Sequence, residues 1–141
     1  MQYFPLFADL KGRAVLLVGA GEVATRKTES LLQAGADVRV VARELAPAFL
    51  DWQNEGRIQW LAREFHPEHL QDVFLVVSAT GDAEVDSQVF KAAQARHLLC
   101  NTVDDTQRCS FITPAVIDRS PIQVAISSSG TSPVLIRHWR Q

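Results

Sequence analysis

The sequence has few of the residues that small proteins use for disulfide or metal stabilisation. It contains two cysteines, Cys100 and Cys109, whose spacing is not the paired Cys-x-x-Cys of a zinc or redox site. Its four histidines form no His-x-x-x-His or Cys–His pairing of the zinc type. We therefore expect two reduced thiols, as in a cytoplasmic protein, and no metal-ligating residues.

Long apolar runs and an excess of one charge are absent too. No apolar stretch approaches the roughly 20 residues that a membrane helix needs, and the N-terminus lacks the basic and apolar regions of a signal peptide. A net charge of −2 gives no general attraction to nucleic acid or to an anionic membrane. These features predict a cytoplasmic protein with neither a nucleic-acid partner nor a membrane partner.

The run from Val15 to Ala24 is the most informative part of the chain. It is typical of a buried strand that leads through a Gly-x-Gly-x-x-Ala turn into a helix. Gly19 permits a tight turn, Gly21 lets the backbone approach a pyrophosphate, and Ala24 allows close packing of helix and strand. The helix that follows directs its N-terminal amides and positive dipole end at the phosphates. This order of parts predicts a dinucleotide-binding site.

The rest of the chain alternates between short apolar runs and helical patterns, which predicts an α/β fold with an open, doubly wound, Rossmann-like parallel sheet. We expect Val23, Leu31 and Leu32 to face the sheet from the first helix, Lys27 to face outward, Gly35 to end that helix and Asp82 to cap the third. The expected strands and helices, in chain order, are strand 15–18, helix 25–34, strand 37–42, helix 45–55, strand 58–61, strand 73–80, helix 82–96 and strand 98–101.

From residue 102 the sequence is polar and rich in turns. Residues 111–114 are expected to be extended, and residues 122–127 alternate as a half-buried strand. We divide the chain into a Rossmann domain over residues 1–113 and a second segment over residues 114–141.

Four stretches together carry a more specific signal. They are residues 4–7, residues 18–24 with Arg26 and Lys27, the Asn-x-x-Asp loop 101–104, and residues 110–133 with a Ser-x-Gly-Thr-Ser-Pro loop. In this combination the chain resembles the N-terminal module of siroheme synthase, the precorrin-2 dehydrogenase and sirohydrochlorin ferrochelatase. The two loops are much more specific to this family than the glycine turn, which many enzymes share.

The resemblance implies two reactions at one site. NAD takes a hydride from precorrin-2 to give sirohydrochlorin, and ferrous iron is then inserted as a substrate to give siroheme. Asp104 would be the acid/base group in both steps, with Asp105 a solvated neighbour. The implied cofactor residues are Gly19, Gly21, Glu22 and Val23 at the pyrophosphate, Arg43 and Glu44 at the adenosine ribose, and Ala79 and Thr80 at the nicotinamide half.

The resemblance also implies a tetrapyrrole substrate that carries many carboxylates, and a homodimer whose dimerisation region begins at residue 114. We expect the family's helical substrate-covering domain to be missing from these 141 residues. The residues expected to contact the substrate are Asn101, Thr102, Arg119, Ser128, Gly130 and Thr131.

The sequence leaves two alternatives for the cofactor and two for the function. The second strand is followed by Arg43, which would suit the 2′-phosphate of NADP, and then by Glu44, which would suit the free ribose hydroxyl of NAD. The family's use implies NAD. A non-catalytic NAD-binding redox sensor is the alternative function. An unrelated reductase would need a catalytic tyrosine or histidine pair, and the one tyrosine, Tyr3, lies in the apolar lead-in.

Overall fold

The computed structural model describes residues 1–127, which divide into two compact units. One unit is Phe7–Ser110, and the other combines residues 1–6 with the chain from Phe111 onward.

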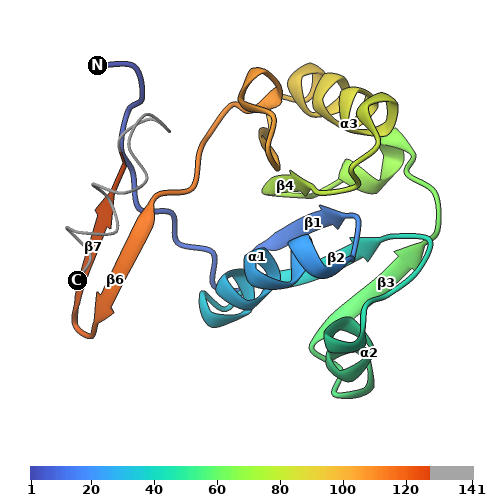
Figure 1. The fold of residues 1–141 in the computed structure, drawn as a ribbon, viewed down its shortest axis with the longest axis horizontal. Helices are drawn as coiled ribbons and strands as arrows, with labels where there is room; N and C mark the ends of the chain where they lie inside the picture. Colours follow the sequence, from blue (N-terminus) through green and yellow to red (C-terminus); the bar gives the residue numbers. More distant parts are fainter. Residues whose placement is uncertain (128–141) are drawn as a thin grey trace. The chain divides into compact units, whose positions relative to one another are not determined.

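The Phe7–Ser110 unit is a five-stranded, fully parallel sheet with helices on both faces (Figure 1). The strand order is β3-β2-β1-β4-β5. The order reverses between β1 and β4, so the two strands leave a crevice beyond their carboxyl ends. This arrangement confirms the predicted Rossmann-like fold. The strands are β1 (Ala14–Val18), β2 (Asp37–Val41), β3 (Ile58–Ala62), β4 (Leu75–Ser78) and β5 (Leu99–Thr102).

Three α-helices cover the sheet, with α3 on one face and α1 and α2 on the other (Figure 1). The first helix begins at Glu22, three residues before the expected start, and Gly35 follows its end with a φ of +79°. The second begins at Pro47, because proline is well suited to the first helical position. The helices are α1 (Glu22–Gln33), α2 (Pro47–Asn54) and α3 (Ala83–Ala95), and two short 3-10 helices are η1 (Pro67–Leu70) and η2 (Thr106–Arg108).

The prediction of which face of α1 is buried was wrong for two residues. Ala24 and Thr28 are the fully buried positions, and they are four residues apart on one face. Val23 is therefore turned away from the sheet and is 62% exposed. Lys27, which was expected to face outward, is half-buried.

The core is built on the central strands. All five residues of β1 and all four of β4 are buried, as expected for parallel strands covered on both faces. Leu16, Val76 and Val89 are fully buried between β1, β4 and α3. On the other face Phe49 and Trp52 of α2 meet edge to face, with ring centroids 5.1 Å apart.

The second unit contains an antiparallel hairpin of β6 (Ala115–Arg119) and β7 (Ile122–Ile126). The strand at β7 was expected, but β6 was not, since Ala115–Arg119 has no clear apolar alternation. Its pairing with β7, from Ala115 opposite Ile126 to Arg119 opposite Ile122, supplies the structure that its own sequence does not specify. Within the described chain, none of the helices has the length and hydrophobicity to cross a membrane.

The N-cap of α3 gives a direct test of this fold. Asp82 accepts hydrogen bonds from the backbone N–H groups of Glu84 (3.0 Å) and Val85 (3.4 Å), as the sequence predicts. We expect Asp82→Ala to lower the free energy of unfolding by about 1 kcal/mol, measured by urea denaturation. Glu84→Ala removes an exposed charge from the same turn without removing a capping bond, and it should have the smaller effect. Equal losses would contradict the capping role.

Candidate functional site

The turn after β1 brings three strand ends into close contact. Gly19 has a φ of +96°, and its N–H donates to the carbonyl of Val41 at 2.9 Å. A Cβ at Gly19 would lie 2.4 Å from the carbonyl oxygen of Ala79, closer than any side chain can approach. Only glycine fits here, on grounds of both space and backbone conformation.

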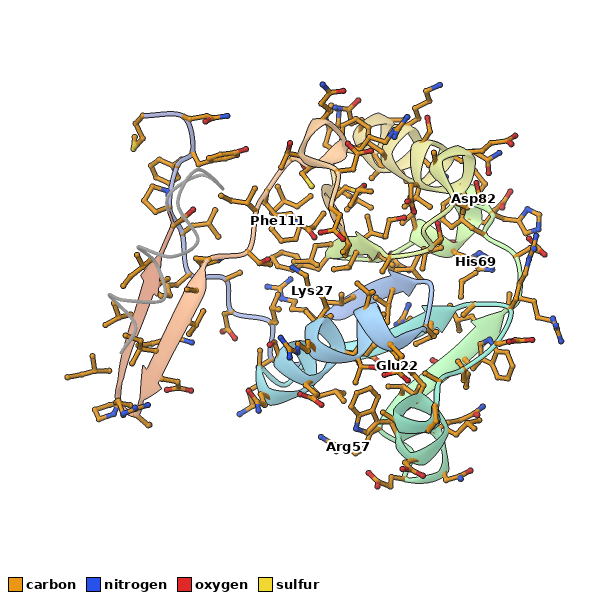
Figure 2. The ribbon with its side chains drawn as sticks, in the orientation of Figure 1. Glu22, Lys27, Arg57, His69, Asp82 and Phe111 are labelled. Atoms are coloured by element: carbon orange, nitrogen blue, oxygen red, sulfur yellow. The ribbon has the colours of Figure 1, made fainter. Side chains whose placement is uncertain are left out.

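Two residues later the surroundings are open. Gly21 is the N-cap of α1, and nothing lies within 4 Å of the position that its Cβ would occupy. The backbone N–H groups of Glu22 and Val23 begin the helix at this point, and Glu22 is exposed there (Figure 2). An open space at a helix N-terminus without a side-chain cap fits a phosphate group.

A hollow of about 270 Å³ lies over the carboxyl ends of β1 to β4. Glu22 and Val23 do not line it but follow Gly21 directly. The predicted cofactor residues that line the hollow are Gly19, Gly21, Arg43, Glu44, Ala79 and Thr80.

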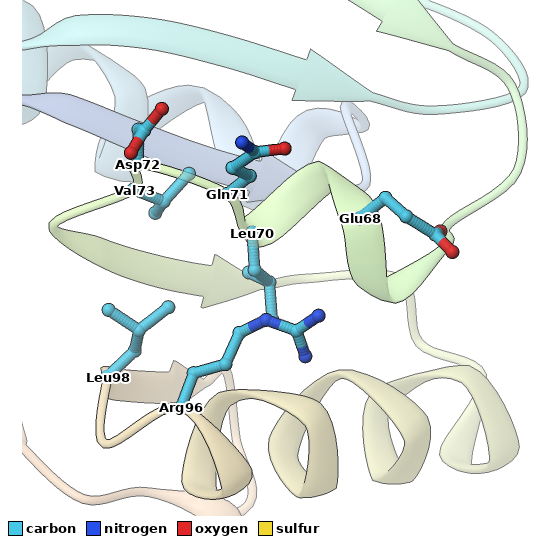
Figure 3. Close-up of a pocket in the computed structure, with 7 residues that line it drawn as sticks. All are labelled: Glu68, Leu70, Gln71, Asp72, Val73, Arg96 and Leu98. Carbon is cyan, nitrogen blue, oxygen red and sulfur yellow. The ribbon is translucent and has the colours of Figure 1, made fainter.

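A larger hollow of about 390 Å³ lies at the opposite ends of the strands, where Val73 precedes β4 and Leu98 precedes β5 (Figure 3). It contains none of the predicted site residues. Because ligands of open parallel sheets bind beyond the carboxyl ends of the strands, the hollow above β1 to β4 is the candidate cofactor site.

Arg43 is engaged by a residue that the sequence analysis did not consider. Its Nε donates to Oε1 of Glu64 at 2.9 Å and its second guanidinium nitrogen lies 3.4 Å from Oε2. The hydrogen bond and the charge of Glu64 raise the pKa of Arg43 above its usual value. Glu64 also lines the hollow.

Thr80 is fixed by a buried carboxylate. Oδ1 of Asp86 accepts hydrogen bonds from the hydroxyls of Ser78 and Thr80, both at 2.7 Å. The Thr80 hydroxyl in turn accepts the N–H of Asp82 at 3.0 Å. Asp86 is 7% exposed, so the end of β4 is held by a carboxyl group that is withdrawn from water.

Asp86 was not among the predicted site residues, although its sequence position indicates a buried acid. It lies on the same face of α3 as Val89 and Ala93, three and seven residues later, which are fully buried. An acidic residue in an apolar stripe is a candidate for a buried hydrogen-bonded site.

Asp104 lies in a tight turn that follows β5. The N–H of Asp105 donates to the carbonyl of Thr102 at 3.2 Å, and Asp104 has a φ of +62°. The N–H of Val103 donates to the carbonyl of Ser78 at 2.9 Å, which ties the turn to the end of β4. Asp104 is exposed, and its left-handed backbone is uncommon for a residue other than glycine.

The turn is held from beneath by Cys109. Its sulfur accepts the N–H of Thr102 at 3.2 Å and lies 3.2 Å from the carbonyl oxygens of Thr102 and Asp105, either of which can accept the thiol hydrogen. Burial raises the pKa of Cys109, and it raises that of Cys100 to about 11. Both thiols are free, as expected.

Asp105 is not the solvated residue that was expected. It is half-buried, and its carboxylate pairs with Arg108 at 2.5 Å. Asn101 and Thr102 are also buried, at 5% and 1% exposure. The part of the 101–105 loop that is open to solvent is therefore Asp104.

Lys27 of α1, labelled in Figure 2, interacts electrostatically with Asp104 and Cys109 of this region. Burial lowers the pKa of Lys27, while its electrostatic interactions with Cys109 and Asp104 act in the opposite direction. Desolvation is the larger effect. The loop thus has a partly buried amine as an electrostatic neighbour.

The remaining predicted residues do not belong to this unit. Arg119 ends β6 in the second unit, is exposed, and donates to the carbonyl of Asp118 at 3.1 Å. Ser128, Gly130 and Thr131 lie outside the described residues. Over residues 1–127 no group of three or more His, Cys, Asp or Glu side chains could hold a metal ion.

Comparisons with known proteins agree with this geometry. Residues 6–115 match a family model described as "Putative NAD(P)-binding". The chain is 57% identical over 141 residues to siroheme synthase 1 of Yersinia enterocolitica, 52% to siroheme synthase 1 of Serratia proteamaculans and 51% to siroheme synthase of Zymomonas mobilis. All of this chain is covered, but it spans about 30% of the length of these relatives.

A solved structure named SirC, precorrin-2 dehydrogenase, has the same fold. It superposes with a TM-score of 0.83 at 32% sequence identity, covering 98% of this chain and 68% of that one.

The two glycines of the first turn should respond differently to one added methyl group. Gly19→Ala should lower the free energy of unfolding by at least about 2 kcal/mol, because it combines a backbone clash with an unfavourable φ. Gly21→Ala should lower it by about 1 kcal/mol or less but weaken dinucleotide binding, since the methyl group enters the open space. Urea denaturation and calorimetric titration with NAD⁺ measure the two effects. A Gly21→Ala chain that binds NAD⁺ normally would contradict this assignment.

The thiols should react slowly in the folded chain. Because burial raises both pKa values, less thiolate is present at pH 8 than in the unfolded chain, and we expect iodoacetamide to modify Cys109 slowly and Cys100 more slowly still. Mass spectrometry of the alkylated peptides, with the urea-unfolded chain as control, measures the rates. If Cys109 reacts equally fast folded and unfolded, it does not hold the 101–105 loop as described.

Proposed function

This chain belongs to the NAD(P)-binding family found as the N-terminal module of siroheme synthases, and on that premise we propose that it oxidises precorrin-2 to sirohydrochlorin with NAD. One observation carries the proposal. The backbone bond between Val103 and Ser78 joins the Asp104 turn to the strand whose end lines the cofactor hollow. A carboxylate and a dinucleotide site at neighbouring strand ends suit a reaction that removes a hydride and a proton.

The cofactor would lie across the crevice. Glu22 and Val23 would bind its pyrophosphate through their backbone N–H groups at the start of α1, with Gly21 leaving the space open. Arg43 and Glu44 would border the adenosine ribose. Ala79 and Thr80, the latter fixed by Asp86, would border the nicotinamide half. When bound, the nicotinamide supplies the acceptor for the hydride.

Asp104 would act as the base. As precorrin-2 loses a hydride to the cofactor, the carboxylate of Asp104 would accept the proton that precorrin-2 must also lose. The product therefore differs from the substrate by two hydrogens. The carboxylate is exposed at the end of β5, which gives a large substrate access to it.

The same carboxylate would serve a second reaction. Ferrous iron, entering sirohydrochlorin as a substrate, displaces two pyrrole N–H protons, and Asp104 would accept protons in that step as well. The tetrapyrrole carboxylates would be bound by Arg119, Ser128, Gly130 and Thr131. Asn101 and Thr102, which were also expected to contact the substrate, are buried at 5% and 1% exposure and would instead support the Asp104 turn.

We further propose a homodimer whose contact begins at residue 114. Val116, Ile122 and Val124 of the hairpin are 41–66% exposed, which is the apolar surface that such a contact would bury. A non-catalytic redox sensor remains the second candidate, and it is favoured only if Asp104 proves dispensable or the chain binds NAD⁺ without turnover.

The role of Asp104 can be tested with an isosteric variant. Asp104→Asn keeps the left-handed turn, which asparagine tolerates, but it removes the base. We expect the melting temperature to be unchanged and turnover to fall by at least about 100-fold. Anaerobic oxidation of precorrin-2 with NAD⁺, followed by the absorbance of sirohydrochlorin, measures it.

Asp72→Asn is a matched control. Asp72 also has a left-handed backbone, with a φ of +59°, and lies at the opposite end of the sheet. Its variant should oxidise precorrin-2 normally. Full activity of Asp104→Asn, or equal losses in both variants, would refute the catalytic assignment.

A further inference from the structure

We propose that Glu64 selects the cofactor, by occupying Arg43 and adding negative charge where the 2′-position of the adenosine ribose would lie. This rests on the proposed dinucleotide function and deepens it. The selected ligand is a dinucleotide with a free 2′-hydroxyl, and the rejected one carries a 2′-phosphate.

The geometry brings the two residues together from neighbouring strands. Arg43 comes two residues after the end of β2, and Glu64 comes two residues after the end of β3. The strands are paired to their ends, with Val41 opposite Ala62. Arg43 and Glu64 are therefore fixed side by side on the wall of the hollow, with two nitrogens of the guanidinium directed at the two carboxylate oxygens.

Arg43 without Glu64 would favour the opposite cofactor. An arginine close after the second strand of this fold is suited to the 2′-phosphate of NADP, because the guanidinium fork matches phosphate oxygens. In this chain Nε and one terminal nitrogen of that fork are already directed at Glu64. A 2′-phosphate would have to displace one carboxylate and then remain next to it.

The remaining charges around the hollow add to this repulsion. Among its lining residues Arg43 and Arg63 are cationic, whereas Glu44, Glu64 and Asp82 are anionic, which leaves one negative charge in excess. A ribose hydroxyl is indifferent to that excess and can donate to Glu44. The 2′-phosphate dianion of NADP would be repelled by that excess. The wall therefore discriminates by repelling NADP as well as by binding the free 2′-hydroxyl of NAD.

The pair can be altered without harming the fold. The side chains of Arg43 and Glu64 are 72% and 60% exposed, and ion pairs this exposed contribute little to stability. Glu64→Gln keeps the size and polarity of the side chain while removing its charge. It isolates the electrostatic contribution.

The experiment is calorimetric titration of the 141-residue chain with NAD⁺ and with NADP⁺, at low and at high salt. The unaltered chain should bind NAD⁺ more tightly than NADP⁺. Glu64→Gln should lower the ratio of the NADP⁺ to the NAD⁺ dissociation constant by about fivefold at low salt, and by less at high salt. In the double variant Arg43→Ala/Glu64→Gln most of this fall in the ratio should disappear, because the uncharged glutamine side chain favours NADP⁺ by leaving Arg43 free to bind the 2′-phosphate.

Glu68→Gln is the control, because it removes the same charge from a residue four positions further along the chain, which lines the other hollow and not the candidate site. It should leave the ratio unchanged. An unchanged ratio in Glu64→Gln, or the same shift in both variants, would overturn the role of Glu64 while leaving the proposed function intact. Failure of the unaltered chain to bind either dinucleotide would instead refute the proposed cofactor, and the selectivity with it.

Discussion

The close approach of Gly19 to Ala79 is the constraint on which the rest of this structure depends. The turn after β1 is pressed against the end of β4 so tightly that a hydrogen is the largest group that fits between them. These are the two strands between which the order of the sheet reverses. The helix after β1 covers one face and the helix after β4 the other, so the chain diverges here and leaves the crevice open. The cofactor hollow, the fixed Thr80 and the Asp104 turn all lie on the edge that this contact defines.

Much of the fold could be predicted because local signals agreed. The apolar run of β1, the glycine that ends α1 and the aspartate that begins α3 each depend on neighbours close in sequence. The errors occurred where that agreement was missing. The start of α1 was placed three residues late, and its fully buried positions are the small Ala24 and the polar Thr28 rather than large apolar residues, so Val23 and Lys27 were assigned to the wrong sides. The strand β6 owes its structure to its partner rather than to its own sequence.

The candidate site divides in the same way. Gly19, Arg43 and Thr80 could be brought to one edge from the sequence, because the carboxyl ends of parallel strands meet there. The residues that hold these site residues in place could not be predicted from the sequence. Glu64 pairs with a residue 21 positions away, and Cys109 supports its turn through backbone atoms, so neither contact leaves a pattern in the sequence. The groups expected to meet the ligand were thus more predictable than the groups that orient them.

The hollow also links ligand binding to folding. Its wall is assembled from the ends of four strands, and these come from segments spread between Val18 and Val85. The unfolded chain cannot reproduce that arrangement, so a ligand that binds there binds the folded state alone. At a concentration 100 times its dissociation constant, such a ligand adds about 2.7 kcal/mol to the free energy of unfolding. For a domain of this size that is a substantial share of the total. The supply of dinucleotide would therefore govern how well this chain resists thermal unfolding and proteolysis.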